Sequence, residues 1–238
     1  MNLKIKMKNV LFLDIETVPQ EEFWSNVPEN SQQLFSKKTA YQRKEDVTPE
    51  DFYERAGIWA EFGKIICISV AYFKEIDAER SLRITSFYGD DEKQILLDFK
   101  NLLDTHFNKG YHVLCAHNGK EFDFPYIARR MIIHQIELPA KLNLFGKKPW
   151  EVPHLDTMEL WKFGDFKHYS SLQLLTSILG IPSPKDDIDG SEVANVYYKD
   201  KDLDRIVNYC EKDTIAVAQL LLRFNNEKLV ELNEIVKV

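Results

Sequence analysis

The sequence lacks the features that mark secreted, membrane-embedded or dinucleotide-binding proteins. Its three cysteines, Cys67, Cys115 and Cys210, are far apart in the chain. They form neither paired positions for a disulfide framework nor a C-x-x-C zinc pattern. No apolar run approaches the ~20 residues of a membrane helix, and no G-x-G-x-x-G loop is present. We therefore expect a cytoplasmic protein without structural zinc, membrane contact or a dinucleotide cofactor.

Positive charge is also scarce. The chain has 31 Lys and Arg against 38 Asp and Glu, which gives a formal net charge of −7. Domains that coat nucleic acid by charge alone tend to be strongly basic, so this class is disfavoured. An acidic nucleic-acid enzyme remains compatible, because bound divalent cations reverse the field of an acidic site. The N-terminal residues run directly into an apolar strand without a cleavage site, so we expect no signal peptide.

What is present is an alternation of short apolar runs and amphipathic segments. Strands are predicted at about 9–13, 64–73, 82–88, 112–116 and 154–156. Helices are predicted at about 90–107, 124–134, 157–163, 170–179, 190–198 and 202–223. An early antiparallel meander followed by later βα crossovers predicts one α/β domain over residues 1–238.

Two segments stand outside this alternation. Residues 18–62 are polar with scattered aromatic side chains, and they exceed the ~12–15 residues of an ordinary loop. We expect an insertion after the first strand that contains short helices and acts as a lid or binding segment. Residues 224–238 are charged, and we expect a C-terminal helical extension there.

Asp14 and Glu16 stand two positions apart at the end of the first predicted strand. The alternation of side chains along a strand puts both carboxylates on the face of Phe12, opposite its neighbours in the chain. Carboxylates so close repel each other unless positive charge lies between them, and a divalent cation would supply it. An ordinary strand end with one exposed acid is the alternative for this pair alone.

A second polar group follows the strand predicted at 112–116. Asn118 opens the run Asn-Gly-Lys-Glu-Phe-Asp, which ends at Asp123 where the next predicted helix begins. Functional residues gather at the carboxyl ends of strands in α/β sheets. Taken alone, Asp123 is better explained as a helix N-cap, and Asn118 is equally well a turn residue beside Gly119.

The last predicted helix carries an acid on its apolar face. Tyr209 and Asp213 are four residues apart, so they lie on one side of the helix. That side is the inward stripe, which consists of Ile206, Tyr209, Cys210, Asp213, Ala216, Val217 and Leu220. Asp213 interrupts this stripe, and a buried carboxylate is costly unless it is paired or metal-bound.

The order of these segments is more specific than any one of them. Strand D-x-E, then N-x-x-x-F-D after a strand, then helical Y-x-x-x-D resembles the DEDD superfamily of 3′–5′ exonucleases, the DnaQ-like members of the ribonuclease H-like fold. Tyr209, four residues before Asp213, resembles the tyrosine (DEDDy) subgroup. The histidine subgroup has its histidine five residues before the last aspartate, where this sequence has Asn208.

The second motif narrows the resemblance. Asn118, Phe122 and Asp123 are similar to the second exonuclease motif of family B DNA polymerases. The resemblance extends over about residues 9–220. It implies a ribonuclease H-like mixed five-stranded sheet flanked by helices, with the insertion after the first strand. We expect a stand-alone exonuclease related to that proofreading domain.

The resemblance also implies a chemistry, namely two-metal hydrolysis of the terminal phosphodiester bonds of single-stranded DNA with release of 5′-mononucleotides. Asp14, Glu16, Asp123 and Asp213 would hold two Mg²⁺ or Mn²⁺ ions roughly 3.5–4 Å apart. Oxygen ligands suit these hard cations. Tyr209 would orient the attacking water through its hydroxyl, because a phenol with a pKa of ~10 is a poor base at neutral pH.

Residues beside the acids are expected to contact the substrate. These are Thr17, Asn118 and Phe122, with core packing as the alternative for Phe122. Single strands are bound by aromatic stacking and local positive charge. The further candidates are Trp24, Phe35, Tyr41, Trp59, Lys37, Lys38, Arg43, Lys44, Arg129, Arg130, Lys147 and Lys148, and for the charged ones a solvated surface is the alternative.

Two more polar residues lie close to the motifs. Asp156 ends the last predicted strand and either supports the metal ligands or, slightly favoured, caps the helix that begins near Met158. His117 adjoins the second motif, where hydrogen bonding in the strand turn is favoured over catalysis. The six histidines show no metal-ligand spacing.

Several functions remain open on the sequence alone. The same chemistry on RNA requires recognition of the 2′-hydroxyl, and no residue decides between the two substrates. A catalytically silent nucleic-acid-binding module and a small-molecule α/β protein also stay open, although the complete set of acids argues against the silent module. The partner we expect is nucleic acid with a free 3′ end, DNA favoured, in a repair or proofreading-like role.

Overall fold

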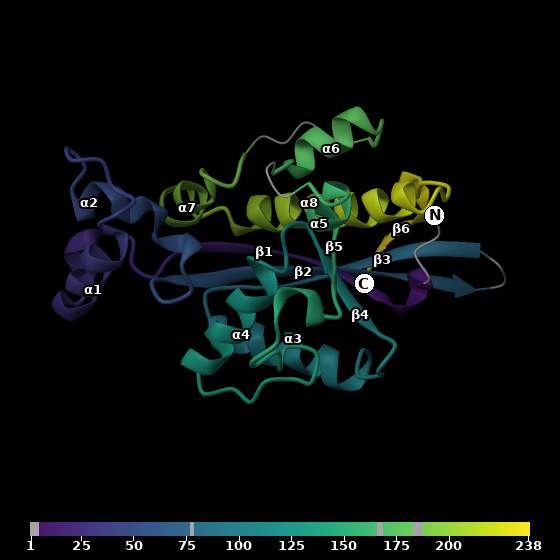
Figure 1. Ribbon diagram of the computed structural model, residues 1–238, viewed down its shortest axis with the longest axis horizontal. Helices are drawn as coiled ribbons and strands as arrows, with labels where there is room; N and C mark the ends of the chain where they lie inside the picture. Colours follow the sequence, from purple (N-terminus) through teal and green to yellow (C-terminus); the bar gives the residue numbers. More distant parts are fainter. Residues whose placement is uncertain (1–4, 77–78, 166–168, 183–187) are drawn as a thin grey trace.

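A computed structural model of the chain describes residues 5–76, 79–165, 169–182 and 188–238 (Figure 1). The described strands are β1 (Val10–Pro19), β2 (Gly63–Ile76), β3 (Glu79–Tyr88), β4 (Val113–Ala116), β5 (Leu155–Asp156) and β6 (Ile235–Lys237). The described helices are α1 (Glu29–Thr39), α2 (Pro49–Phe52), α3 (Glu92–Thr105), α4 (Asp123–Ile133), α5 (Thr157–Lys162), α6 (Leu172–Ile178), α7 (Val193–Asn195) and α8 (Leu203–Phe224). The predicted α/β class is therefore confirmed.

The sheet is mixed, with the strand order β5-β4-β1-β2-β3-β6. β1, β2 and β3 pair antiparallel, which confirms the predicted meander, although the connection at 77–78 lies outside the described residues. β4 and β5 continue the sheet in parallel from β1. The carboxyl ends of β1, β4 and β5 consequently meet at one edge of the sheet, where functional groups gather in α/β folds.

Helices cover both faces of the sheet (Figure 1). Side chains alternate along β1, so Leu11 and Leu13 point to the same face of the sheet. On that face they pack in a cluster with Phe99 of α3 and Ile127 of α4. The opposite side of β1 packs on α8 through Phe12 and other buried apolar residues. The face that carries the even-numbered residues of β1, Asp14 and Glu16 among them, is therefore the face that α8 covers.

The sheet has six strands rather than the five that we expected. The C-terminal segment was predicted to be helical, and that prediction is wrong: a 3-10 turn at Leu232–Glu234 leads into β6, which pairs parallel with β3. The amide of Val238 also donates to the carbonyl oxygen of Ile84 at 3.0 Å. β6 pairs with backbone N–H and C=O groups of β3 that would stay unpaired if β3 were the edge strand. This pairing explains why the segment forms a strand instead of a charged helix.

The insertion at 18–62 contains short helices, as predicted, and builds a small aromatic core of its own. Phe35 is fully buried at 0% exposure. Its ring centroid lies 5.2 Å from that of Phe62, 5.8 Å from that of Trp59 and 5.7 Å from that of Trp24. Trp24, Phe35 and Trp59 therefore pack on each other, which corrects their interpretation as stacking surfaces for substrate. Tyr41 is the exception, because it is 83% exposed.

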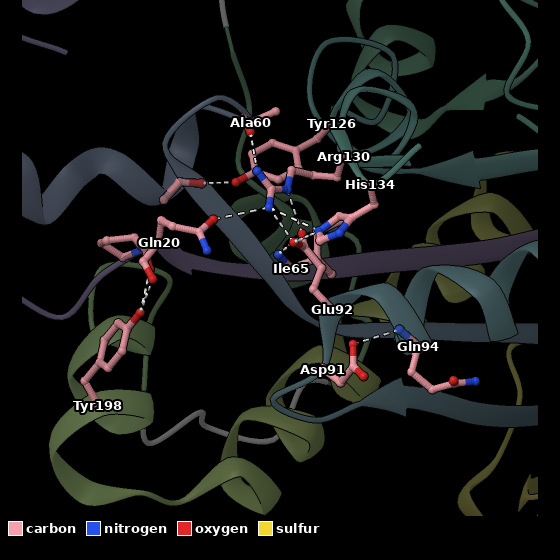
Figure 2. A network of polar contacts seen from close by, with 12 residues as sticks. Gln20, Ala60, Ile65, Asp91, Glu92, Gln94, Tyr126, Arg130, His134 and Tyr198 are labelled. Atoms are coloured by element: carbon pink, nitrogen blue, oxygen red, sulfur yellow. Dashed lines mark hydrogen bonds and ion pairs between the residues drawn. The ribbon is translucent and has the colours of Figure 1, made fainter. Parts of the chain in front are cut away.

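A buried ion pair joins α3 to α4 (Figure 2). The guanidinium of Arg130 donates from Nε to Glu92 Oε1 at 2.8 Å and forms a second contact from Nη2 to the other carboxylate oxygen. Glu92 also accepts the amide of Ile65 at 2.7 Å and lies 2.6 Å from Nε2 of His134. Arg130 is only 3% exposed. Its interpretation as a surface cation for substrate is therefore wrong.

The same arginine ties down both ends of the insertion (Figure 2). Arg130 donates to the carbonyl oxygen of Ala60 at 2.9 Å and to the side-chain oxygen of Gln20 at 3.3 Å. Nearby, the hydroxyl groups of Thr17 and Tyr126 both lie 2.8 Å from the carbonyl oxygen of Gly57, to which they donate. The insertion is thus anchored to β1 and α4 at its two ends. Among the described residues, no helix combines the length and apolarity needed to cross a membrane.

Candidate active site

Asp14 and Glu16 lie on β1, which pairs with β2 on one side and, just before these acids, with β4 on the other. Asp14 is opposite Ser69 of β2, and Glu16 is opposite Cys67. Glu16 is buried at 7% exposure and Asp14 is half-buried. The pairing of β1 with β2 shifts register just after Glu16. Such an irregularity marks the end of the regular stretch and re-aims the residues that follow.

The turn after β4 delivers Asp123 to the same place. Asn118 adopts a left-handed backbone conformation with φ of 62°. At Gly119 a Cβ atom would stand 2.4 Å from the Cβ of Ala116, so only glycine fits this turn. α4 then begins at Asp123, which is 3% exposed and accepts hydrogen bonds from its own amide and from the amide of Ile15. Asp123 is thus bound to β1 between the two acids of that strand.

α8 supplies the third part of the site. Asp213 is half-buried on this helix, on the side that packs against the sheet. Tyr209 packs, half-buried, against a cluster that includes Val18 of β1 and Ile66 of β2. The predicted shared face of Tyr209 and Asp213 is therefore directed at the end of β1.

The electrostatics show that the four acids converge. Burial raises the pKa of Asp14 well above its usual value, and repulsion from Glu16, Asp213 and Asp123 raises it further. Burial likewise raises the pKa of Glu16, with Asp213 and Asp123 contributing repulsion. For Asp123, burial is again the main cause, and the pKa rises to about 8. Carboxylates drawn from β1, α4 and α8 are therefore close enough to repel one another.

The donor set suits a divalent cation. No lysine or arginine in the described part of the chain offsets the repulsion at Asp14, Glu16 or Asp123. Like charges held this close need positive charge or protons, and carboxylate oxygens are the ligands that Mg²⁺ and Mn²⁺ prefer.

Cys210 is a member of the site that the sequence analysis missed. Single ligand atoms of Asp14, Glu16 and Cys210 all lie within 4.8 Å of one another. The Cys210 thiol donates to the carbonyl oxygen of Asp14 at 3.4 Å and packs against Cys67. Burial raises the pKa of Cys210 well above its usual value, which keeps the thiol protonated. Its position three residues before Asp213, on the same helical face, was the available signal.

Asp156 caps α5, as we slightly favoured, and it also binds backbone amides of the turn after β4; support of metal ligands stays a prediction. Its Oδ1 accepts the amides of Met158 and Glu159 at 2.9 and 3.2 Å, which caps α5. The same oxygen accepts the amide of Asn118 at 3.0 Å, and Oδ2 accepts the amide of Lys120 at 3.1 Å. One buried carboxylate therefore fixes the turn that leads to Asp123.

The predicted substrate residues border the acids in different ways. Thr17 follows Glu16 and uses its hydroxyl on Gly57. Phe122 is half-buried, with its ring centroid 5.3 Å from that of Tyr126. Asn118 stands at the mouth of a neighbouring cavity. These placements leave substrate contact by all three residues as a prediction.

His117 is held by structural hydrogen bonds, as we expected. Its Nδ1 lies 2.9 Å from the hydroxyl of Thr157, and its Nε2 lies 2.9 Å from the carbonyl oxygen of Ser170. Burial lowers the pKa of His117. The ring therefore joins β4 to the segment before α6.

Comparisons with known proteins identify the family of the chain and a similar fold. Residues 58–232 match a family described as predicted 3′–5′ exonucleases related to the exonuclease domain of PolB. Among solved structures, the chain is similar to the family B DNA polymerase from the hyperthermophilic archaeon Pyrobaculum calidifontis, with a TM-score of 0.50 and 15% sequence identity. The match covers 90% of this chain and 24% of the polymerase chain. At this identity the similarity shows a shared fold.

Proposed function

The chain belongs to the family of predicted 3′–5′ exonucleases related to the exonuclease domain of PolB, and we propose that it removes nucleotides from the 3′ end of single-stranded DNA. In this proposal residues 1–238 form a single ribonuclease H-like exonuclease domain of the DEDDy type. Each turnover hydrolyses the terminal phosphodiester bond and releases a 5′-mononucleotide.

One observation carries the proposal. Asp14, Glu16, Asp123 and Asp213 come from three separate elements, and burial, followed by their mutual repulsion, raises the pKa of Asp14 and of Glu16. A protein gains no stability from such an arrangement, so the cluster is best explained by a bound cation. We propose that the four carboxylates hold two Mg²⁺ or Mn²⁺ ions. When bound, the metals activate water and neutralise charge on the leaving oxygen.

The remaining side chains orient the reactants. Tyr209 holds the attacking water through its hydroxyl, because a phenol keeps its proton at neutral pH and therefore positions rather than deprotonates. Thr17 and Asn118 contact the terminal nucleotides, and Phe122 supports the strand beside the acids. The insertion at 18–62 borders the strand as a lid, with Tyr41 as its most exposed aromatic residue.

The direct test is digestion of oligonucleotides labelled at the 3′ end, with matched 3′-blocked strands, in Mg²⁺, Mn²⁺ or EDTA. We expect metal-dependent mononucleotide release that needs a free 3′ end. Asp14→Ala and Asp213→Ala should each lower the rate by about 10²–10³ or more, the usual effect of removing one group that stabilises charge in the transition state. Unchanged rates in either variant would contradict the assignment.

Tyr209→Phe separates positioning from metal binding. We expect it to slow hydrolysis by about 10–100-fold, the range typical of groups that orient a metal ligand or water. An effect as large as that of Asp213→Ala would show that the hydroxyl does more than hold water. An RNA strand of the same sequence, included in each assay, decides whether the 2′-hydroxyl is tolerated. Binding without hydrolysis in any metal would favour a silent nucleic-acid-binding module.

A further inference from the structure

A cavity of about 620 Å³ lies beside the acid cluster, between α4, the loop 134–153 and α5. Its size is that of a small-molecule site, since such pockets span about 300–1,000 Å³. The walls are largely apolar, with Pro125, Ala128 and Ile132 on α4 and Leu142 and Phe145 on the loop. The cavity is separate from the acid cluster and takes no part in the chemistry proposed for it.

One wall offers an open aromatic face. Phe145 lines the cavity and is nevertheless 74% exposed. Ile132, on the opposite wall, is 48% exposed. Exposed apolar side chains that converge on a concave surface mark a place where another molecule binds.

Basic side chains surround this apolar space. Lys120, Arg129, Lys147 and Lys162 all line it. The side chains of Arg129 and Lys147 form no hydrogen bond or ion pair with any residue that the structure describes, although Arg129 is close enough to Glu61 to lower the pKa of that acid. Unpaired cations around an apolar pocket suit a ligand with a flat apolar body and attached anionic groups.

Three acids lie on the same walls, and each of them already has a partner within the protein. Glu159 forms an ion pair with Lys120. Asp156 uses its oxygens on four backbone amides. Glu121 has one long contact, 3.5 Å from the hydroxyl of Tyr169. With four cations and three acids, the walls have a net charge of +1, in a chain whose net charge is −7.

One short turn of the chain joins the cavity to the acid cluster. Asn118, Lys120 and Glu121 line the cavity, and Asp123, at the end of the same turn, belongs to the acids. A strand whose terminal phosphodiester lies at the acids therefore has a neighbouring nucleotide within reach of the cavity. The side-chain amide of Asn118 at the mouth can both donate to and accept from the edge of a base.

We propose that this cavity receives one base of the bound single strand, upstream of the bond that is cut, with the adjoining phosphates next to Arg129 and Lys147. The inference rests on the proposed function, because it assumes that the strand ends at the acids. Phe145 stacks on the base, and Asn118 contacts its edge. A free nucleotide has the same chemistry, and the experiment below distinguishes the two sources.

The test compares two exposed aromatic residues of one loop. Phe145→Ala removes the cavity wall, whereas Trp150→Ala removes a side chain that is 75% exposed but does not line the cavity. Binding of a fluorescent, 3′-blocked 12-mer in EDTA is followed by anisotropy, so that the readout does not require catalysis. Since stacking is worth roughly a tenfold change in affinity per base, we expect about a tenfold weaker Kd for Phe145→Ala. We expect less than a twofold change for Trp150→Ala.

A second pair of changes tests the charges. Arg129→Gln with Lys147→Gln should reduce the slope of log K against log salt by about 1.4, since each phosphate contact on a single strand contributes ~0.7. Hydrolysis of the p-nitrophenyl ester of thymidine 5′-monophosphate, which reaches only the acids, should be unchanged in all these variants. Equal affinities for Phe145→Ala and Trp150→Ala, together with an unchanged salt slope, would overturn the proposal.

The outcomes separate this proposal from the proposed function. If the wild-type protein hydrolyses neither the ester nor an oligonucleotide in any metal, the proposed function fails, and the proposal, which rests on it, falls with it. If hydrolysis occurs but the variants bind the 12-mer as the wild type does, only the cavity assignment fails. If deoxyadenosine monophosphate binds in a Phe145-dependent manner while the 12-mer does not, the occupant is a free nucleotide and the strand assignment is wrong.

Discussion

Neutralising Asp123 should stabilise the metal-free protein, although most substitutions of buried residues destabilise. Asp123→Asn keeps the shape of the side chain and one oxygen that can accept the amide of Ile15. It also removes a titratable group whose charged form is unfavourable, because burial and, after it, repulsion from Asp156 raise the pKa of Asp123 to about 8. At pH 7 the folded protein therefore keeps this carboxyl group protonated, and the substitution removes the cost of holding that proton while keeping the hydrogen bonds.

The size of the effect follows from the pKa. An unfolded aspartate has a pKa of ~3.9, and each unit of difference corresponds to ~1.36 kcal/mol. From pH ~3.9 to pH 7, which is roughly three pH units, the folded state keeps a proton that the unfolded chain has lost. This difference sets an upper bound of ~4 kcal/mol on the destabilisation caused by Asp123 at pH 7. Water entry and relaxation reduce such penalties. We therefore expect Asp123→Asn to raise the free energy of unfolding by about 1–3 kcal/mol at pH 7.

The sign of the pH dependence follows from the same difference. Below pH ~4 the carboxyl group is protonated in both states and costs nothing. As the pH rises from ~4 to ~8 the unfolded chain loses its proton while the folded chain keeps it, so stability falls across this window. In metal-free buffer the wild-type protein should therefore lose stability as the pH rises from about 5.5 to about 8. Asp123→Asn should flatten that slope.

The assay is urea denaturation in EDTA at several pH values, repeated with Mg²⁺ or Mn²⁺. Glu45→Gln, an exposed acid outside the cluster, is the matched control and should change stability by less than about 0.5 kcal/mol. Added metal should stabilise the wild type, because it binds only the folded cluster, and should stabilise Asp123→Asn much less. A variant less stable than wild type in EDTA, with an unchanged pH slope, would refute the reasoning.

Two further substitutions test the scaffold. Glu92→Gln leaves the buried Arg130 without its carboxylate and should lower the free energy of unfolding by about 3–5 kcal/mol. As a control, Lys38→Met breaks an exposed ion pair and should lower it by less than about 1 kcal/mol. Similar denaturation midpoints in the two variants would show that the buried network contributes little. Asp156→Asn should lower kcat on oligonucleotides by about 10–100-fold, because its new amide group faces backbone donors. Ser171→Ala, which removes only the cap of α6, should lose about 1 kcal/mol of stability and no activity; equal kcat values in these two variants would contradict a positioning role for Asp156.

The parts of the site that could be predicted are those in which spacing alone decides which side chains share a face. Period two along a strand put Asp14 and Glu16 together, and a four-residue interval on a helix put Tyr209 with Asp213. Their convergence is a different matter. It depends on β4 pairing parallel with β1 and on α8 crossing the same strand, which no local pattern encodes. Only the resemblance to a known motif order supplied that step.

Neighbouring residues with the same chemistry show where the local pattern fails. Arg129 and Arg130 are identical in type, yet the first lines a surface cavity and the second is buried against Glu92. The 100° step between successive helical residues turns one outward and one inward. Apolar residues flank both arginines closely, at Ile127–Ala128 and Met131–Ile133, so the pattern does not decide which arginine faces inward. The partner of Arg130 lies 38 residues away in the chain, so its burial became visible only in the fold.

The same limit explains the aromatic residues of the insertion. A scatter of tryptophan, tyrosine and phenylalanine in a polar segment suits either a binding surface or a small core. Phe35 could satisfy either role until Phe62 and Trp59 are seen at 5.2 and 5.8 Å from it. Polar composition measured over the whole segment hid this core, because its aromatic members come from positions far apart in the insertion.

The positions of the acids in the fold explain how the folded chain can hold a cluster so unfavourable. Moving the carboxylates apart would relieve their mutual repulsion. Carboxylates on flexible loops would move apart in this way. Here Asp14 and Glu16 lie on a strand that β2 and β4 hold from its two sides, and Asp123 is bound to the amide of Ile15 on that same strand. Separation would require breaking the sheet or detaching α4, which Arg130 ties to Glu92. The acids therefore remain close together in the folded state, and a bound cation relieves their repulsion. Because the site is already formed, binding of the cation requires little rearrangement of the protein.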